Sequence, residues 1–146
     1  MREIEMDAIV AQMEKDAFAK HLGIELVEVK PGRATVRMRV AREHCNSVGI
    51  VHGGVTFTLA DYAFAAACNS YGTVAVAINC HISYLRPPKD ELLVAEATEV
   101  SKSRRLGTYD VKVTDGSGNL VAVFQGMAFR KDEPHPGSGS EVCKRA

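Results

Sequence analysis

The apolar residues of this chain recur with two different periods, and the change of period separates helices from strands. Between residues 3 and 22 they recur every three or four positions, the spacing of a helix with one buried face, and Gly23 can end that helix. Residues 24–30 and 33–40 have strand-like sequences. The proline–glycine pair between them suits the two central positions of a tight turn, so a β-hairpin is expected here.

Further strand patterns fill the second half of the chain. Apolar residues alternate with smaller or polar ones along 73–85, and similar patterns follow at 92–101, 105–114 and 120–130. A glycine-rich turn signal at 115–119 joins the last two. Together with the hairpin, these segments supply one antiparallel sheet. The order of helix, two strands, helix and four strands therefore predicts an α+β fold.

An apolar segment at residues 55–68 separates the two groups of strands. Its hydrophobic side chains surround the helix axis, and such a helix is normally buried on most sides, so the sheet is expected to wrap around it. Asp61 is the only charged residue in this segment, and an ionised carboxylate buried there without partners would be costly. Asp61 is either a buried structural aspartate or an active-site carboxylate.

The start of the same helix carries His52, Gly53 and Gly54. Glycines let the backbone approach a ligand closely, and the free N–H groups of a helix N-terminus favour an anion or a developing oxyanion. Asp61 follows Gly53 by eight residues, which is about 12 Å along the axis at roughly 1.5 Å per residue. Asp61 therefore cannot reach the N-terminus of its own helix. If the two features cooperate, they belong to two copies of the chain, which predicts a two-fold dimer with composite sites.

The combination of these features resembles one known family. The sequence HCNSVGIVHGGVTFTLADYAFAAACNS at 44–70, followed by INCHISYLRP at 78–87, is similar to the hotdog-fold acyl-CoA thioesterases of the phenylacetate-pathway (PaaI-like) group. The resemblance covers about residues 20–130. It implies a hotdog fold, in which an antiparallel sheet wraps around a long central helix, here with an extra N-terminal helix. We expect homodimers at least, with dimers pairing into homotetramers.

The resemblance also implies roles for individual residues. In that family the acid that Asp61 matches is a nucleophile or a general base for water. The backbone N–H that Gly53 matches polarises the thioester carbonyl. His52 would shape the glycine loop, and Asn46 would hold the nucleophilic water or the substrate on the subunit that bears the glycine. A thioester carbonyl is already electrophilic, so an oxyanion donor and one carboxylate could suffice, with no metal and no cofactor beyond the CoA of the substrate.

One auxiliary position of the family is different in this chain. Some relatives place a Ser or Thr one helical turn after the acid or near the middle of the following strand. This chain has Ala65, Ala77 and Ile78 at those places. The auxiliary role is therefore vacant, or it has moved to Thr58 or Asn79.

Candidate substrate contacts lie in two regions. Arg104 and Arg105, in the basic sequence SKSRR between two expected strands, could bind the phosphates of CoA, although a solvated turn is an equal alternative. Arg86 is a weaker candidate for the same role. The acyl group is expected to enter between subunits, against residues at the start and middle of the long helix: Gly54, Phe57, Thr58, Tyr62 and Phe64.

Composition and charge exclude several classes of protein. Eighteen basic residues balance eighteen acidic ones, so no overall field favours nucleic acid or an anionic membrane. The chain lacks a continuous apolar signal or membrane-spanning run, and its four cysteines show no CxxC or disulfide spacing, so a soluble cytoplasmic protein is expected. Histidine and cysteine spacings match no usual zinc pattern. No cysteine has the surroundings of a nucleophile.

These observations lead to one functional hypothesis with two alternatives. The hypothesis is an acyl-CoA thioesterase that hydrolyses an aryl substrate, such as phenylacetyl-CoA or hydroxyphenylacetyl-CoA, or a medium-chain acyl-CoA, to the free acid and CoA. The alternatives are a non-catalytic acyl-CoA binder or sensor, and a hotdog enoyl-CoA hydratase or dehydratase. Residues 1–130 are expected to form a single domain. Residues 131–146 are rich in Pro, Gly, Ser and charge, and they are expected to be a disordered tail.

Overall fold

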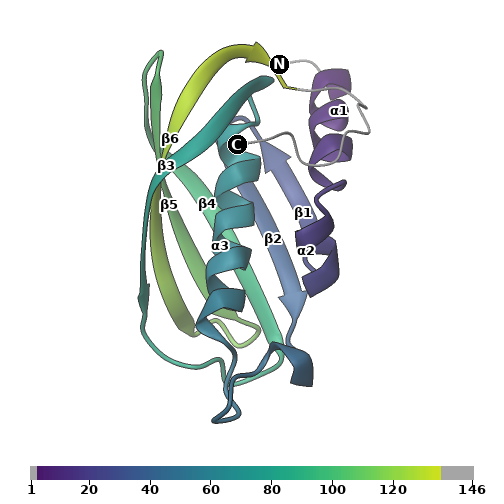
Figure 1. Ribbon diagram of the computed structural model, residues 1–146, viewed down its shortest axis with the longest axis vertical. Helices are drawn as coiled ribbons and strands as arrows, with labels where there is room; N and C mark the ends of the chain where they lie inside the picture. Colours follow the sequence, from purple (N-terminus) through teal and green to yellow (C-terminus); the bar gives the residue numbers. More distant parts are fainter. Residues whose placement is uncertain (1–2, 136–146) are drawn as a thin grey trace.

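The computed structural model describes residues 3–135, and Figure 1 shows their arrangement. In chain order the elements are α1 (Glu3–Met13), α2 (Ala17–Leu22), β1 (Glu25–Lys30), β2 (Arg33–Arg39), the 3₁₀ helix η1 (Arg42–His44), α3 (Gly53–Cys68), β3 (Thr73–Tyr84), β4 (Leu92–Lys102), β5 (Leu106–Asp115) and β6 (Leu120–Pro134).

The strands form one six-stranded sheet in the order β1-β2-β4-β5-β6-β3, and every neighbouring pair is antiparallel. The sheet curves around α3, which contacts all of its strands, while α1 and α2 lie beside β1 (Figure 1). This is the hotdog arrangement, so the predicted fold class is confirmed. The edges of the sheet are β1 and β3.

The N-terminal segment differs from the single helix expected over residues 3–22. It is broken into α1 and α2, because the Asp16 carboxylate accepts a hydrogen bond from the N–H of Ala19 at 2.9 Å and caps a new helix. The hydroxyl of Tyr62 on α3 donates to the backbone carbonyl of Met13 at 2.7 Å. This buried bond ties the end of α1 to the central helix.

The expected turns occur where glycine can adopt a positive φ. Gly23 ends α2 with a φ of 77°, as predicted, and its N–H donates back to the carbonyl of Lys20. Gly32 has a φ of 74° in the β1–β2 hairpin, where the proline–glycine turn was predicted.

Most of α3 is buried, as its composition predicts, but one side of it is not. The core side includes Leu59, Ala60 and Phe64, and Phe64 packs against the rings of Tyr109 and Phe124 with centroids 5.7 and 5.8 Å apart. Beyond Gly53, the residues of α3 that are not buried lie on one side of the helix, and we call them the open stripe of α3: Gly54, Phe57, Thr58, Asp61 and Ala65.

The long strand β3 does not keep the regular alternation that its sequence predicts. Its pairing with β6 is shifted between Ala77 and Asn79, so Ile78 is an extra residue in a β-bulge. Ala75 is buried, whereas Val76 before the shift and Ile78 at it, both on the apolar side of the predicted alternation, are 40% and 55% exposed. Much of this edge strand is therefore open.

The expected domain boundary at residue 130 falls inside β6. This strand continues to Pro134 because it pairs along the full length of β3, from Ala122 opposite Tyr84 to Pro134 opposite Thr73. The rest of the segment expected to be disordered, residues 136–146, lies outside the described residues.

Candidate active site

The N-terminus of α3 is organised by His52. The imidazole Nδ1 of His52 accepts a hydrogen bond from the N–H of Gly54 at 2.9 Å, which makes His52 the N-cap of the helix and leaves its ring proton on Nε2. The His52 carbonyl accepts from Val55 and Thr56. Among the described residues, none accepts a hydrogen bond from the N–H of Gly53. One donor at the positive end of the helix is thus free.

Both glycines are crowded by neighbouring rings, and neither has a positive φ. A Cβ on Gly53 would lie 3.3 Å from Cζ of Tyr84, and a Cβ on Gly54 would lie 3.1 Å from Nδ1 of His52. A side chain at either position would press against these rings and obstruct the approach of a ligand to the helix N-terminus.

Asn46 holds the loop that leads to this helix. Its side-chain oxygen accepts from the N–H of Val48 at 3.0 Å and of Ile50 at 3.3 Å. A backbone bond from Asn46 N–H to the Ile50 carbonyl at 2.8 Å closes the loop, and Gly49 has a φ of 83° within it. Because its oxygen is occupied, the side-chain NH₂ is the group of Asn46 that can donate to a ligand.

Asn46 and Gly53 line the same cavity of about 310 Å³ at the start of α3. The other residues that line the cavity come from the loop before α3, from α3 itself, from the end of β3 and the residues after it, and from β6: Ile50, Val51, Thr56, Tyr84, Leu85, Arg86, Pro87 and Val121. Nothing in the sequence patterns indicates the contribution of Tyr84, which comes from an ordinary-looking strand end. The cavity combines apolar walls with a few polar groups, which is typical of a site for a small organic ligand.

Asp61 lies in the middle of the open stripe. Its carboxylate makes no hydrogen bond and no ion pair with any described residue, although the side chain is partly buried. Burial raises the pKa of Asp61 above its usual value, and the negative charge of Asp16 raises it further. A structural aspartate would be expected to have donors around it, so this environment favours the active-site interpretation.

Of the other residues predicted for the site, some lie on the open stripe of α3 and some lie in the core. Phe57 and Thr58 lie on the open stripe, and the Thr58 hydroxyl donates to the carbonyl of Gly54 at 2.7 Å. Phe64 is 1% exposed and belongs to the core, so it does not line an open slot in this chain. Burial, with a smaller effect from Asp61, raises the pKa of the Cys68 thiol to about 12, which keeps it a thiol rather than a nucleophilic thiolate.

A second cavity, of about 380 Å³, lies at the other end of α3. It is lined by the β3 start, the β4–β5 turn and the end of β6: Thr73, Lys102, Ser103, Arg104, Arg130, Lys131 and Asp132. Asp132 pairs with Arg105 at 2.8 Å and with Arg104 at 3.5 Å. We call this cavity the basic pocket.

Arg130 is the residue of the basic pocket that sequence reasoning missed. Its Nε and Nη1 atoms are buried and have no hydrogen-bond partner among the described residues. Its guanidinium lies 5.3 Å from the centre of the Tyr71 ring, and Lys102 Nζ lies 3.8 Å from the same ring. The only signal in the sequence is its position at the end of the last strand pattern, next to Lys131.

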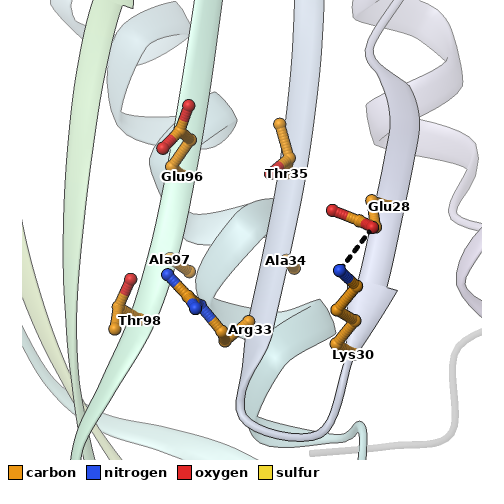
Figure 2. Close-up of a pocket in the computed structure, with 8 residues that line it drawn as sticks. All are labelled: Glu28, Lys30, Arg33, Ala34, Thr35, Glu96, Ala97 and Thr98. Carbon is orange, nitrogen blue, oxygen red and sulfur yellow. Dashed lines mark ion pairs between the residues drawn. The ribbon is translucent and has the colours of Figure 1, made fainter.

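Figure 2 shows a third cavity, a polar groove of about 300 Å³ on β1, β2 and β4. Lys30 and Glu28 form an ion pair there at 3.0 Å, and Arg33 and Glu96 extend over the sheet. The buried residues of β2 that alternate with Arg33, such as Val36, point to the face that packs on α3. The groove is therefore on the opposite face of the sheet from Asp61 and does not join the candidate site.

Metal-binding clusters and membrane-spanning helices are both absent from residues 3–135. No group of three or more His, Cys, Asp and Glu side chains in this range could hold a metal ion. No helix in the same range is long and apolar enough to cross a membrane.

Comparison with known proteins gives consistent matches. Residues 48–122 match the family described as the thioesterase superfamily. The chain is 40% identical to acyl-coenzyme A thioesterase PaaI of Escherichia coli (strain K12) over 121 residues, which are 82% of this chain and 86% of that protein. The solved structure of the E. coli PaaI protein from the phenylacetic acid degradation operon has a TM-score of 0.84 and 37% identity, and the match covers 89% of this chain and 95% of that one. A Streptococcus mutans UA159 protein, crystallised bound to acetyl CoA, has a TM-score of 0.72 and 27% identity, with 77% and 91% covered.

Proposed function

The chain belongs to the thioesterase superfamily and is an acyl-CoA thioester hydrolase, and from this premise we propose that it hydrolyses aryl-CoA substrates, such as phenylacetyl-CoA and hydroxyphenylacetyl-CoA, or medium-chain acyl-CoA, at a site shared by two subunits. The observation that carries the proposed site is the Asp61 carboxylate, partly buried and unpartnered on the open stripe of α3. The bound acetyl CoA of the S. mutans protein supports the same class of ligand here.

The open stripe and the open edge strand support a dimer. Antiparallel pairing of β3 with its copy across a two-fold axis would continue the sheet and would set the two α3 helices side by side, pointing in opposite directions. The eight residues between Gly53 and Asp61 separate them by about 12 Å along one helix. In the antiparallel pair, Asp61 of one subunit comes opposite the helix N-terminus of the other. We further propose that such dimers pair into homotetramers.

The chemistry can be written with groups of this chain. The thioester carbonyl oxygen would accept a hydrogen bond from Gly53 N–H and a second from the Asn46 NH₂, the donors that the fold leaves free. Asp61 would take a proton from water as the water oxygen bonds to the carbonyl carbon; the C–S bond then breaks, and Asp61 returns that proton to the departing thiolate of CoA, which leaves the free acid and CoA. A raised pKa makes Asp61 the stronger base once it is ionised.

The basic pocket is proposed to hold the phosphates of CoA. Arg104 and Arg105, predicted for this role, are partly neutralised by Asp132, whereas Arg130 has donors without partners. The pocket adjoins Thr73 at the start of β3. In the antiparallel dimer this end meets the partner's end of β3, next to the cavity at the start of the partner's α3. A CoA chain could thus extend from one subunit into the thioester site of the other.

The structure argues against the hydratase alternative but does not separate the non-catalytic binder from the proposed enzyme. A hydratase would need a histidine beside the acid, but His81 lies with Asp110 and Gln125 on the outer face of the sheet, and the Nδ1 of His52 is occupied as a helix cap. No observation favours a hydratase. A non-catalytic binder would use the same cavities, and only an activity measurement separates it from the proposed enzyme.

The test is thiol release from a panel of acetyl-, hexanoyl-, phenylacetyl- and hydroxyphenylacetyl-CoA, with wild type and Asp61→Asn compared. The expected result is turnover of an aryl or medium-chain ester that falls by orders of magnitude in Asp61→Asn, while circular dichroism and the melting temperature show a folded variant. Ligand-induced thermal stabilisation without thiol release from any ester would instead support the binder. An unchanged rate in Asp61→Asn would remove Asp61 from the mechanism.

A further inference from the structure

Tyr84, the last residue of β3, reaches back to the first residue of α3. Its hydroxyl donates a hydrogen bond to the carbonyl of Gly53 at 3.0 Å, across 31 positions of sequence. Its ring also covers the α-carbon of Gly53, because a Cβ built there would lie 3.3, 3.4 and 3.5 Å from Cζ, the hydroxyl oxygen and Cε1 of the ring. The ring and the hydroxyl therefore fix Gly53 from two directions.

This contact differs from ordinary core packing. Tyr62 and Tyr109 are 5% and 0% exposed, whereas Tyr84 is 54% exposed and lines the cavity that Asn46 and Gly53 share. A large aromatic ring left half in solvent contributes little to the core. Its position beside the cavity points to a role in the site.

Gly53 needs such support because of its neighbours. Gly53 and Gly54 begin α3, and glycine is the residue with the greatest backbone freedom. His52 holds the N–H of Gly54, but no described residue accepts from the N–H of Gly53. A donor that must meet a developing oxyanion is effective only if its direction is set before the reaction.

We propose that Tyr84 is a positioning residue of the thioester site, which holds Gly53 so that its N–H meets the substrate carbonyl oxygen. The inference rests on the proposed function, and it adds a residue to it. Tyr84 donates to the Gly53 carbonyl rather than to the reacting atoms. The carbonyl that Tyr84 holds and the N–H of Gly53 belong to successive peptide units that meet at the Gly53 α-carbon, so the effect of Tyr84 reaches the substrate only by limiting the backbone rotation of Gly53 that would turn its N–H.

The experiment compares wild type with Tyr84→Phe, which keeps the ring and removes the hydroxyl. Steady-state thiol release is measured first, on the best ester of the panel. Loss of one hydrogen bond that orients the donor is expected to lower kcat/KM by about 3- to 10-fold.

The second readout uses two unreactive CoA probes with the same acyl chain: a ketone, in which a methylene is inserted between sulfur and carbonyl, and a thioether, which has no carbonyl. Calorimetry on Tyr84→Phe is expected to show about 3- to 10-fold weaker binding of the ketone and unchanged binding of the thioether. Tyr109→Phe is the matched control, because it also removes one tyrosine hydroxyl, one that bonds to Glu99 at 3.0 Å within the core. It should lower thermal stability without changing the ratio of ketone to thioether affinity.

The outcomes separate the two proposals. If wild type turns over esters but Tyr84→Phe has the same kcat/KM and the same preference for the ketone, Tyr84 does not position Gly53. Equal weakening of both probes would also overturn the inference, since it would make Tyr84 a wall of the cavity only. If wild type releases no thiol from any ester, the proposed function fails, whatever the probes show for Tyr84→Phe.

Discussion

The shared site can be tested by mixing two inactive subunits. Asp61→Asn removes the base, and Asn46→Asp keeps the side-chain oxygen that accepts from Val48 and Ile50 but replaces the free NH₂. About 12 Å along α3 separates Gly53 from Asp61 in one chain, so in the proposed dimer each site takes Asp61 from one subunit and Asn46 from the other. Random assortment makes about half of the dimers hybrids, and one of the two sites in each hybrid has no substitution. The mixture is expected to recover about 25% of wild-type activity.

The assay is thiol release from equal amounts of the two variants that have been unfolded together and refolded. Each variant refolded alone provides the background. Wild type refolded with Asp61→Asn provides the control for refolding, and it should keep about half of wild-type activity whether or not subunits exchange, because half of all Asp61 carboxylates remain. Exchange is checked separately by tagging one variant and isolating the dimers that contain one tagged and one untagged chain. Background activity in the isolated hybrid dimers of the two variants, together with the expected half in the refolding control, would refute the composite site and require Asp61 to act within its own chain.

Three further predictions concern the cap, the base and the basic pocket. His52→Ala should lose the helix cap and about 0.5–2 kcal/mol of unfolding free energy in urea, whereas His52→Asn, which can accept the same N–H, should lose less. Asp16→Asn removes a negative charge that raises the pKa of Asp61, so Asp61 should stay ionised to lower pH. The acidic limb of log kcat/KM against pH should therefore move to lower pH. An unmoved limb would show that the two carboxylates do not interact. Arg130→Leu should raise KM for acyl-CoA by about tenfold. It should not change KM for the acyl thioester of N-acetylcysteamine, which lacks the nucleotide. Arg33→Leu, in the groove of Figure 2, is the control variant and should change neither KM.

Local patterns predicted the parts of the fold that depend on local chemistry. A proline–glycine pair gave the first hairpin, with Gly32 at a φ of 74°. The all-round apolar segment predicted that α3 would be wrapped by the sheet, and the HGG sequence with Asp61 eight residues after Gly53 indicated where the site would lie. These features could be predicted because each depends on residues close together in the chain.

The structure differs from the sequence-based predictions mainly where residues far apart in the chain determine the local conformation. The bulge at Ile78 follows from the pairing of β3 with β6, and nothing in the alternation of β3 indicates an extra residue. The helical period of the apolar residues continues past Asp16, so it does not indicate that the Asp16 side chain caps a new helix there. Tyr84 and Arg130 enter their cavities only because the sheet brings strand ends to the two ends of α3. Phe64 looked like a pocket residue because helix periodicity does not tell which side of a buried helix stays open.

The open edge of β3 makes a newly synthesised, unassembled subunit prone to aggregation. A strand of 12 residues with Val76 and Ile78 exposed offers unpaired backbone groups and apolar side chains to any other extended polypeptide. A lone subunit is therefore an aggregation hazard until its β3 is covered. Assembly of the proposed dimer would then protect the protein as well as complete its site, so specific activity and resistance to precipitation are expected to fall together as the protein is diluted.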